Sequence, residues 1–286
     1  MSDNKLIQAI KDKGKTMEAE MSFFDHLEAL RWHLIRASIA VVVLTCFAFY
    51  YYDWIFDTVI MGPSKPTFWT YRMLCNIGDY FHRPGFCIDK INIHLLNTEM
   101  AGQFTLQVNS SLLIGVTLGF PYLLFEIWRF IRPALHEKER KAASGFVFYA
   151  TFLFILGVMF GYYVITPESI NFLSGYTVSP LIENKFDIDS YLSSVSTLTL
   201  ATGIVFELPI LVYILSSLGI LTAKFMRDTR RYAIVIILII AAVVTPTPDM
   251  MTMTVVSIPL FVLYEVGIMV SAVVEKRRLK RGEAVE

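Results

Sequence analysis

The chain is poor in charge. Lys, Arg, Asp and Glu make up 17% of its 286 residues, whereas a soluble domain carries roughly 25%. A large soluble core could also give this composition, but the apolar residues come in long blocks rather than at amphipathic spacing. Phe146 to Thr166 is a run of 21 residues without a charge, close to the ~20 that cross a ~30 Å hydrocarbon core. The scarcity and spacing of charge therefore indicate an integral membrane protein.

Catalytic motifs are also missing. His136-Glu137 begins like the H-E-x-x-H zinc motif, but Arg140 stands where the second metal ligand is needed. The sequence around Ser144 lacks the first glycine of a serine-protease site, and no glycine-rich phosphate loop is present. The five histidines are scattered along the chain. We therefore expect no enzyme, no cofactor, no metal and no nucleic-acid partner.

The apolar blocks predict helices, because a segment in lipid must pair all its backbone polar groups internally. We predict an all-α, polytopic membrane protein with one domain, residues 1–286, and six spans. The expected spans are Leu34–Phe56, Val108–Phe130, Phe146–Thr166, Val195–Leu218, Tyr232–Val244 and Met251–Val274. The fifth has only 13 residues, about 20 Å of helix. It indicates local membrane thinning or shielding by protein, unless neighbouring helices simply cap it.

The basic residues are distributed unevenly, although the net charge is zero. Of the 25 Lys and Arg, six lie before residue 37, five in 129–141, four in 224–231 and five in 276–281. The alternate loops hold the remaining five. Because cytoplasmic loops are enriched in Lys and Arg, we expect both termini in the cytoplasm. Residues 1–21 would form a mobile cytoplasmic tail, and residues 275–286 a charged one.

The three cysteines fall in two regions. Cys46 lies in the first span and is expected to be a packing residue. Cys75 and Cys87 lie in the first outward loop, whose compartment is oxidising, so a disulfide between them is predicted. A metal site with His82 is the alternative, but one His and two Cys make an incomplete zinc set.

Two carboxylates lie at mid-membrane depth. Glu207 and Glu265 fall deep inside spans four and six, where a charge costs about 2.5–3.5 kcal/mol on insertion scales. Each could join two helices through a hydrogen-bonded carboxyl, or could form a docking or transport site. The Ser- and Thr-rich residues 193–202 favour a functional role for Glu207, whereas the two interpretations are balanced for Glu265.

Further carboxylates lie near the cytoplasmic membrane surface. Glu28, Glu137 and Glu139 are surrounded by basic residues. They could be an ordinary solvated charge run. They could also form an acidic patch for a cationic partner, since a carboxylate holds a guanidinium through two parallel hydrogen bonds. The residues alone do not decide between these possibilities.

Taken in order, the motifs resemble the TatC family, the multispanning receptor subunit of the twin-arginine protein translocase. They cover most of the chain, from Ser22 to about Val274, on the expected sides of the six spans. The matching segments are His26-Leu27-Glu28-Ala29-Leu30-Arg31, Pro63, Trp128 to Leu135, Glu139-Arg140-Lys141, Asp187 to Leu192, Phe206 to Pro209, Thr245-Pro246 with Pro248-Asp249, Ile258-Pro259 and Tyr264-Glu265.

The resemblance implies a receptor in the cell inner membrane. Such proteins bind twin-arginine signal peptides and assemble with single-span TatA- or TatB-type partners, driven by the proton-motive force. Self-association within the lipid bilayer is expected as well. It implies that Glu139, Glu28, Arg31 and Phe130 bind the signal peptide and that Glu207, with Glu265 as a second polar position, serves the partner helices. Pro63, Pro133 and Asp249 would have structural or assembly roles.

The sequence departs from the family pattern at one acidic position. The usual H-L-x-E-L-R motif has a carboxylate where this chain has Ala29, with Glu28 beside it. One residue along a helix is a rotation of about 100°, so Glu139 would carry more of the recognition. The alternative function is a proton- or ion-coupled secondary transporter that uses Glu207 and Glu265.

Overall fold

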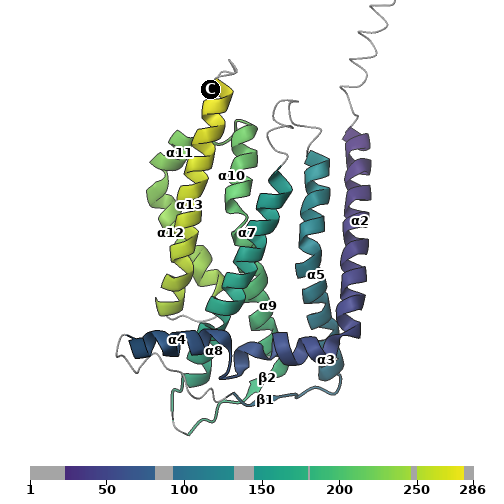
Figure 1. Cartoon of the computed structure of the whole chain (residues 1–286), viewed down its shortest axis with the longest axis vertical. Helices are drawn as coiled ribbons and strands as arrows, with labels where there is room; N and C mark the ends of the chain where they lie inside the picture. The colour runs from purple at the N-terminus through teal and green to yellow at the C-terminus, as the bar shows by residue number, and fades with distance from the viewer. Residues whose placement is uncertain (1–22, 81–92, 132–144, 180, 246–249, 280–286) are drawn as a thin grey trace, which may run out of the picture.

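The structure is a computed structural model that describes residues 23–80, 93–131, 145–179, 181–245 and 250–279 (Figure 1). Long helices stand side by side, and shorter elements cross one end of the bundle. We call that end the cap end. The opposite end, where the described part of α13 finishes, is called the C-terminal end.

In this described part, five helices are long and apolar enough to cross a membrane. Two of them are interrupted: a π-helical turn (η5, Gly161–Ile165) joins α7 to α8, and a break at Glu207 separates α9 from α10. The helices that build these five spans are α2 (Phe23–Tyr50), α5 (Gly102–Ile131), α7 (Phe146–Phe160) with α8 (Thr166–Gly175), α9 (Ile188–Val205) with α10 (Leu208–Ser217), and α13 (Met250–Leu279).

The predicted fifth span corresponds to α12 (Arg230–Val244), which has 15 residues, about 22 Å. The shorter α11 (Ala223–Asp228) precedes it. Hydrogen bonds continue the i→i−4 pattern across the junction, from Thr229 N–H to the Phe225 carbonyl and from Ala233 N–H to the Thr229 carbonyl, both at 3.0 Å. The two helices are therefore nearly one bent rod.

The bounds of α2 differ from the expected ones at both ends. It begins at Phe23 rather than Leu34, so the helix starts well before the apolar run. It ends at Tyr50 rather than Phe56, because the chain then turns across the bundle. The cap consists of this crossing segment together with two very short strands. Its elements, apart from α8, are α3 (Tyr52–Ile55), η1 (Phe56–Ile60), η2 (Gly62–Ser64), α4 (Trp69–Tyr80), β1 (Leu95–Leu96) and β2 (Phe186–Asp187).

The strands β1 and β2 pair in parallel, with Leu95 opposite Phe186 and Leu96 opposite Asp187. Asp187 also fixes the beginning of α9, since its carboxylate accepts a hydrogen bond from the Asp189 N–H at 2.9 Å. Its other oxygen accepts one from the Thr98 hydroxyl at 2.6 Å. These bonds, with Thr98 as the main cause, hold the pKa of the Asp187 carboxyl below its usual range.

Glycines let the helices approach closely where they cross. A Cβ placed on Gly115 of α5 would lie 2.1 Å from the Thr45 hydroxyl and 2.8 Å from the Thr45 nitrogen of α2. One placed on Gly161 would lie 2.8 Å from the Leu198 carbonyl oxygen of α9. Small residues at such crossings are the usual way that membrane helices gain packing contacts in the absence of a hydrophobic driving force.

Candidate functional site

The predicted signal-peptide residues that the structure describes lie at the C-terminal end of the bundle, where α2 begins and α5 ends. Glu28 and Arg31 are exposed on the first turns of α2. Phe130 is half-buried on the last turn of α5, and its ring meets the His33 ring edge-on with centroids 6.2 Å apart. The predicted recognition residue Glu139 lies outside the described residues, as does Pro133, for which a structural or assembly role was predicted. The structure thus brings Arg31 and Phe130 to one end of the same helix pair.

A buried polar cluster lies directly beneath these residues. The His33 imidazole Nδ1 pairs with the Glu126 carboxylate, and the Tyr122 hydroxyl donates a hydrogen bond to its other oxygen at 2.9 Å. The Glu126 side chain is only 3% exposed. A carboxylate that is buried to this extent needs hydrogen-bond partners to offset its loss of hydration. The cluster therefore joins α2 to α5. It also holds the His33 ring in place, and the Phe130 ring packs edge-on against it.

Aromatic stacking holds the next helix against this end. The rings of Trp128 on α5 and Phe146 on α7 lie nearly parallel, at 18°, with centroids 4.1 Å apart. Both side chains are buried. The stack fixes the two points from which residues 132–144 leave and return to the bundle.

Glu207 lies where the fourth long helix breaks. Pro209 stands in the first turn of α10, so its missing N–H costs nothing there. Both carboxylate oxygens of Glu207 are buried, and neither has a hydrogen-bond partner within the described structure. An unpaired buried carboxylate is unfavourable for the isolated chain, which makes Glu207 a candidate for a contact made with another molecule.

A surface hollow of about 700 Å³ adjoins the break through Phe206. Its walls are aromatic and aliphatic and come from four separate elements. The residues that line it are Trp69, Leu156, Met159, Phe160, Tyr163, Phe206 and Pro259. An apolar hollow of this kind within the spans fits hydrocarbon or an apolar helix, and it contains no arrangement for chemistry.

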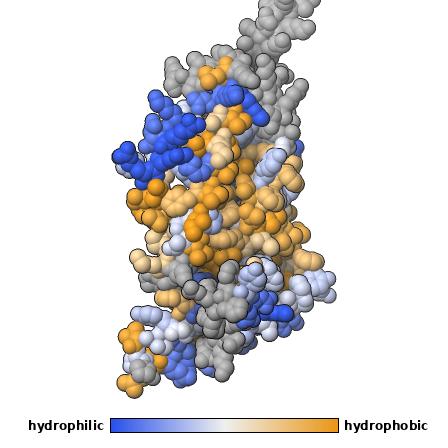
Figure 2. Space-filling view, turned by 60° about the vertical axis from the view of Figure 1, so that its left-hand side comes forward, coloured by the Kyte–Doolittle hydropathy of each residue, from blue (hydrophilic) through white to orange (hydrophobic). Residues whose placement is uncertain are grey.

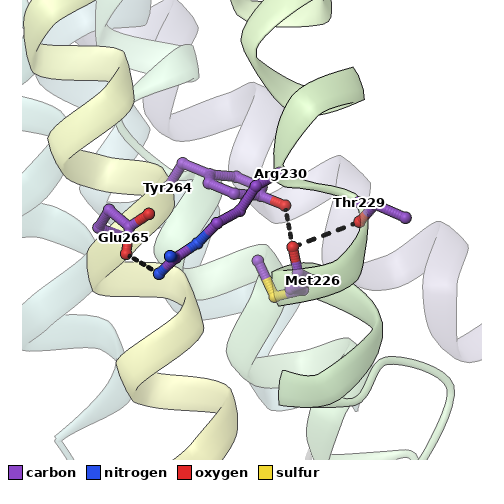
Figure 3. Close-up of polar contacts among 5 residues, drawn as sticks. All are labelled: Met226, Thr229, Arg230, Tyr264 and Glu265. Carbon is purple, nitrogen blue, oxygen red and sulfur yellow. Dashed lines mark hydrogen bonds and ion pairs between the residues drawn. The ribbon is translucent and has the colours of Figure 1, made fainter.

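Glu265 differs from Glu207, because it has a partner. The Arg230 guanidinium, at the beginning of α12, lies 2.6 Å from the Glu265 carboxylate on α13 (Figure 3). Beside this ion pair the Tyr264 hydroxyl donates a hydrogen bond to the Met226 carbonyl at 2.7 Å. Glu265 therefore joins α12 to α13 through an ion pair, a contact that the sequence alone, with its two interpretations balanced, did not predict.

The remaining predicted residues lie at the cap end or outside the described residues. The Pro63 carbonyl is buried and accepts a hydrogen bond of 3.0 Å from the Tyr71 hydroxyl. Burial raises the pKa of Tyr71, so the phenol keeps its proton. Cys75 is disulfide-bonded, whereas Cys46 is free. Cys87, the predicted partner of Cys75, lies outside the described residues, so this pairing stays a prediction. Asp249 also lies outside them.

The structure adds one residue that the sequence interpretation missed. This residue is Glu126, which lies inside the predicted second span. Like Glu207, it is a carboxylate within an apolar run, and that feature could have identified it. Its partner His33 is 93 residues earlier in the chain. No local spacing pattern reveals such a pair.

Long apolar helices, a break at the buried carboxylate of Glu207 and a folded cap define a multi-pass helical membrane protein. A family model for the Sec-independent protein translocase protein TatC matches residues 25–259. The chain belongs to the TatC family. This membership confirms the resemblance inferred from the motifs and does not favour the secondary-transporter alternative.

Individual relatives agree with this assignment. The chain is 37% identical over 266 residues to the TatC protein of Blattabacterium sp. subsp. Periplaneta americana, covering 92% of this chain and 100% of that one. It is 35% identical to the Deinococcus radiodurans TatC protein over 89% of this chain and 87% of the relative. A crystal structure described as the twin-arginine translocase receptor TatC superposes with a TM-score of 0.65 at 29% identity, covering 87% of this chain and 99% of that one.

Proposed function

We propose that this TatC-family chain is the receptor subunit that binds twin-arginine signal peptides at the C-terminal end of its helix bundle. The observation that supports this most strongly is the surface around Arg31 and Phe130, supported from beneath by the buried Glu126 cluster. An acidic group beside an aromatic ring is suited to a guanidinium, through paired hydrogen bonds and stacking. Glu28 supplies one exposed carboxylate there, and Glu139 is the predicted second.

The proposal includes an orientation. With the basic loops inside, the C-terminal end of the bundle faces the cytoplasm of a cell inner membrane and the cap end faces outward. α11 and α12 together would then provide the sixth crossing. The disulfide at Cys75, which we propose to pair with Cys87, would lie in the oxidising compartment.

Glu207 is proposed as the contact for a single-span TatA- or TatB-type partner. Its two buried oxygens have no hydrogen-bond partner among the described residues. The adjoining apolar hollow has room for side chains of a second helix. A polar group of the partner would satisfy the carboxylate as the helix docks. Export of folded proteins by the assembled complex would use the proton-motive force.

The signal-peptide proposal is tested by removing both carboxylates. We expect Glu139→Ala with Glu28→Ala to abolish export of a twin-arginine reporter and to weaken crosslinking of its signal peptide to the membrane-embedded protein. Glu183→Ala is the matched control, because this exposed carboxylate lies in the described chain beyond the bundle's cap end. Undiminished export and crosslinking in the double variant would refute the recognition model.

A further inference from the structure

The outer surface of α11 and the beginning of α12 carries a stripe of basic side chains. Lys224, Arg227 and Arg231 are all exposed, and their spacing of three and then four residues places them on one face of the bent rod. A neighbouring face of α11 is packed against α13, and its residues Ala223 and Met226 are buried. We call Lys224, Arg227 and Arg231 the basic stripe.

The basic stripe keeps its charge available. Within the described residues none of its three side chains forms an ion pair, although exposed Asp228 lies between them. The neighbouring Arg230 differs, because Glu265 neutralises it. The stripe therefore presents a net positive surface, and guanidinium groups suit phosphate because they can donate two parallel hydrogen bonds.

The stripe lies alongside α13 rather than beyond the end of that helix. α11 runs along α13, with the Ala223 N–H 3.3 Å from the Glu275 carboxylate and Arg230 paired with Glu265. Ten residues of α13 separate these two contacts, about 15 Å of helix. The short α12 thus begins well below the end of α13, so a membrane surface that crosses α13 between these two contacts would put the basic stripe at the lipid headgroups.

The same face becomes apolar one turn further along. Val235 is 55% exposed and Ile234 45% exposed on α12, and Val235 follows Arg231 at a spacing of four. On this side of the molecule, Figure 2 shows a strongly hydrophilic patch directly above a hydrophobic surface. A basic surface that continues into an apolar one along one helix matches a molecule with a phosphate head and acyl chains.

We propose that the basic stripe and the apolar face beneath it form a binding site for an anionic phospholipid. The lipid phosphate would lie against Arg227 and Arg231, with Lys224 at its outer edge, and an acyl chain would lie along Val235. An acidic peptide would also suit the charges, but it has no need of the exposed apolar side chains that continue the same face. This inference is independent of signal-peptide binding.

The test uses the full-length purified protein in non-ionic detergent. Native mass spectrometry compares retention of phosphatidylglycerol and phosphatidylcholine with identical acyl chains. We expect selective retention of phosphatidylglycerol, and about thirtyfold weaker binding in Arg227→Gln/Arg231→Gln, equivalent to about 1 kcal/mol for each basic side chain. Lys276→Gln/Arg277→Gln removes the same charge from exposed residues of α13 and should leave retention unchanged.

A second measurement requires no variant. A phosphatidylglycerol with a photoreactive headgroup, added to the wild-type protein, should label peptides within residues 223–235 and not residues 270–279. Equal retention of both lipids, equal loss in the control variant, labelling elsewhere, or displacement of the lipid by millimolar inorganic phosphate would each overturn the proposal. Displacement by an acidic peptide at equimolar concentration would identify a protein-docking surface instead and would equally overturn it.

Discussion

The His33 imidazole on α2 pairs with the Glu126 carboxylate on α5 in a setting where Glu126 is almost fully removed from solvent. The pair lies under Phe130, whose ring packs on the edge of His33. A buried ion pair is weak evidence for net stability, but removing one member leaves its partner uncompensated. The pair therefore couples the packing of two spans to the shape of the proposed recognition surface.

Glu126→Ala should destabilise the protein by about 3 kcal/mol, since it leaves the Tyr122 hydroxyl and His33 without their acceptor. Glu126→Gln keeps an acceptor oxygen and should cost much less. Thermal unfolding of the purified proteins in detergent measures both changes. Glu28→Gln, at an exposed carboxylate, is the control and should leave the midpoint unchanged. Equal losses for the alanine and glutamine variants would show that the hydrogen bonds contribute little.

Gly115→Ala should separate α2 from α5, because the new methyl group would lie 2.1 Å from the Thr45 hydroxyl and 2.8 Å from the Thr45 backbone nitrogen. Backbone cannot move aside as a flexible side chain can, so we expect a loss of about 1–3 kcal/mol. Gly175→Ala is the matched control, since a Cβ there meets nothing within 4 Å. A Gly115→Ala variant as stable as the control would contradict this close packing.

Glu207→Leu should stabilise the isolated protein by about 1–2 kcal/mol while reducing export, because it removes an unpaired buried carboxylate that a partner is proposed to satisfy. Glu207→Gln should retain part of the activity, since an amide can still form hydrogen bonds. The measurements are unfolding in detergent and export of a twin-arginine reporter in cells. If Glu207→Leu both destabilised the protein and left export intact, the carboxylate would serve the chain's own packing.

Acid should loosen the cap. The pKa of Asp187 is depressed in the folded protein, so its contribution to stability is present above the unfolded value of about 3.9 and is lost as the pH falls through the lower folded value. Hydrogen exchange of the Phe186 amide, which donates to the His94 carbonyl at 3.0 Å, should therefore accelerate below about pH 4, beyond the intrinsic pH effect. Asp187→Asn should exchange faster at neutral pH and lose this extra acid sensitivity. Identical pH profiles in the two proteins would exclude Asp187 as the cause.

The disulfide has a simple chemical test. Alkylation of the unfolded, unreduced protein should modify one thiol, Cys46, and reduction beforehand should raise the number to all three cysteines of the sequence. Cys46→Ser should leave no reactive thiol without reduction if Cys75 is paired with Cys87. Reactive thiols in that unreduced variant would point to a different pairing.

Sequence predicted the long spans well, because a run such as Phe146 to Thr166 is set by lipid thickness and needs no knowledge of its neighbours. It could not predict where α2 ends, since the turn at Tyr51 depends on the cap that packs around it. The sequence favoured a functional role for Glu207 because of the Ser- and Thr-rich residues before it, but it left the two interpretations of Glu265 balanced. Only the position of Arg230, 35 residues before Glu265, separates a paired carboxylate from an unpaired one.

The parallel pairing of β1 with β2 also constrains how the protein is made. Leu95 and Phe186 can meet only after the intervening α5, α7 and α8 have been synthesised and inserted. Closing so long a loop is entropically costly and slow compared with forming local helix contacts. The bridge therefore forms late in biogenesis, and chains arrested before residue 186 would present an open cap that quality-control proteases can recognise.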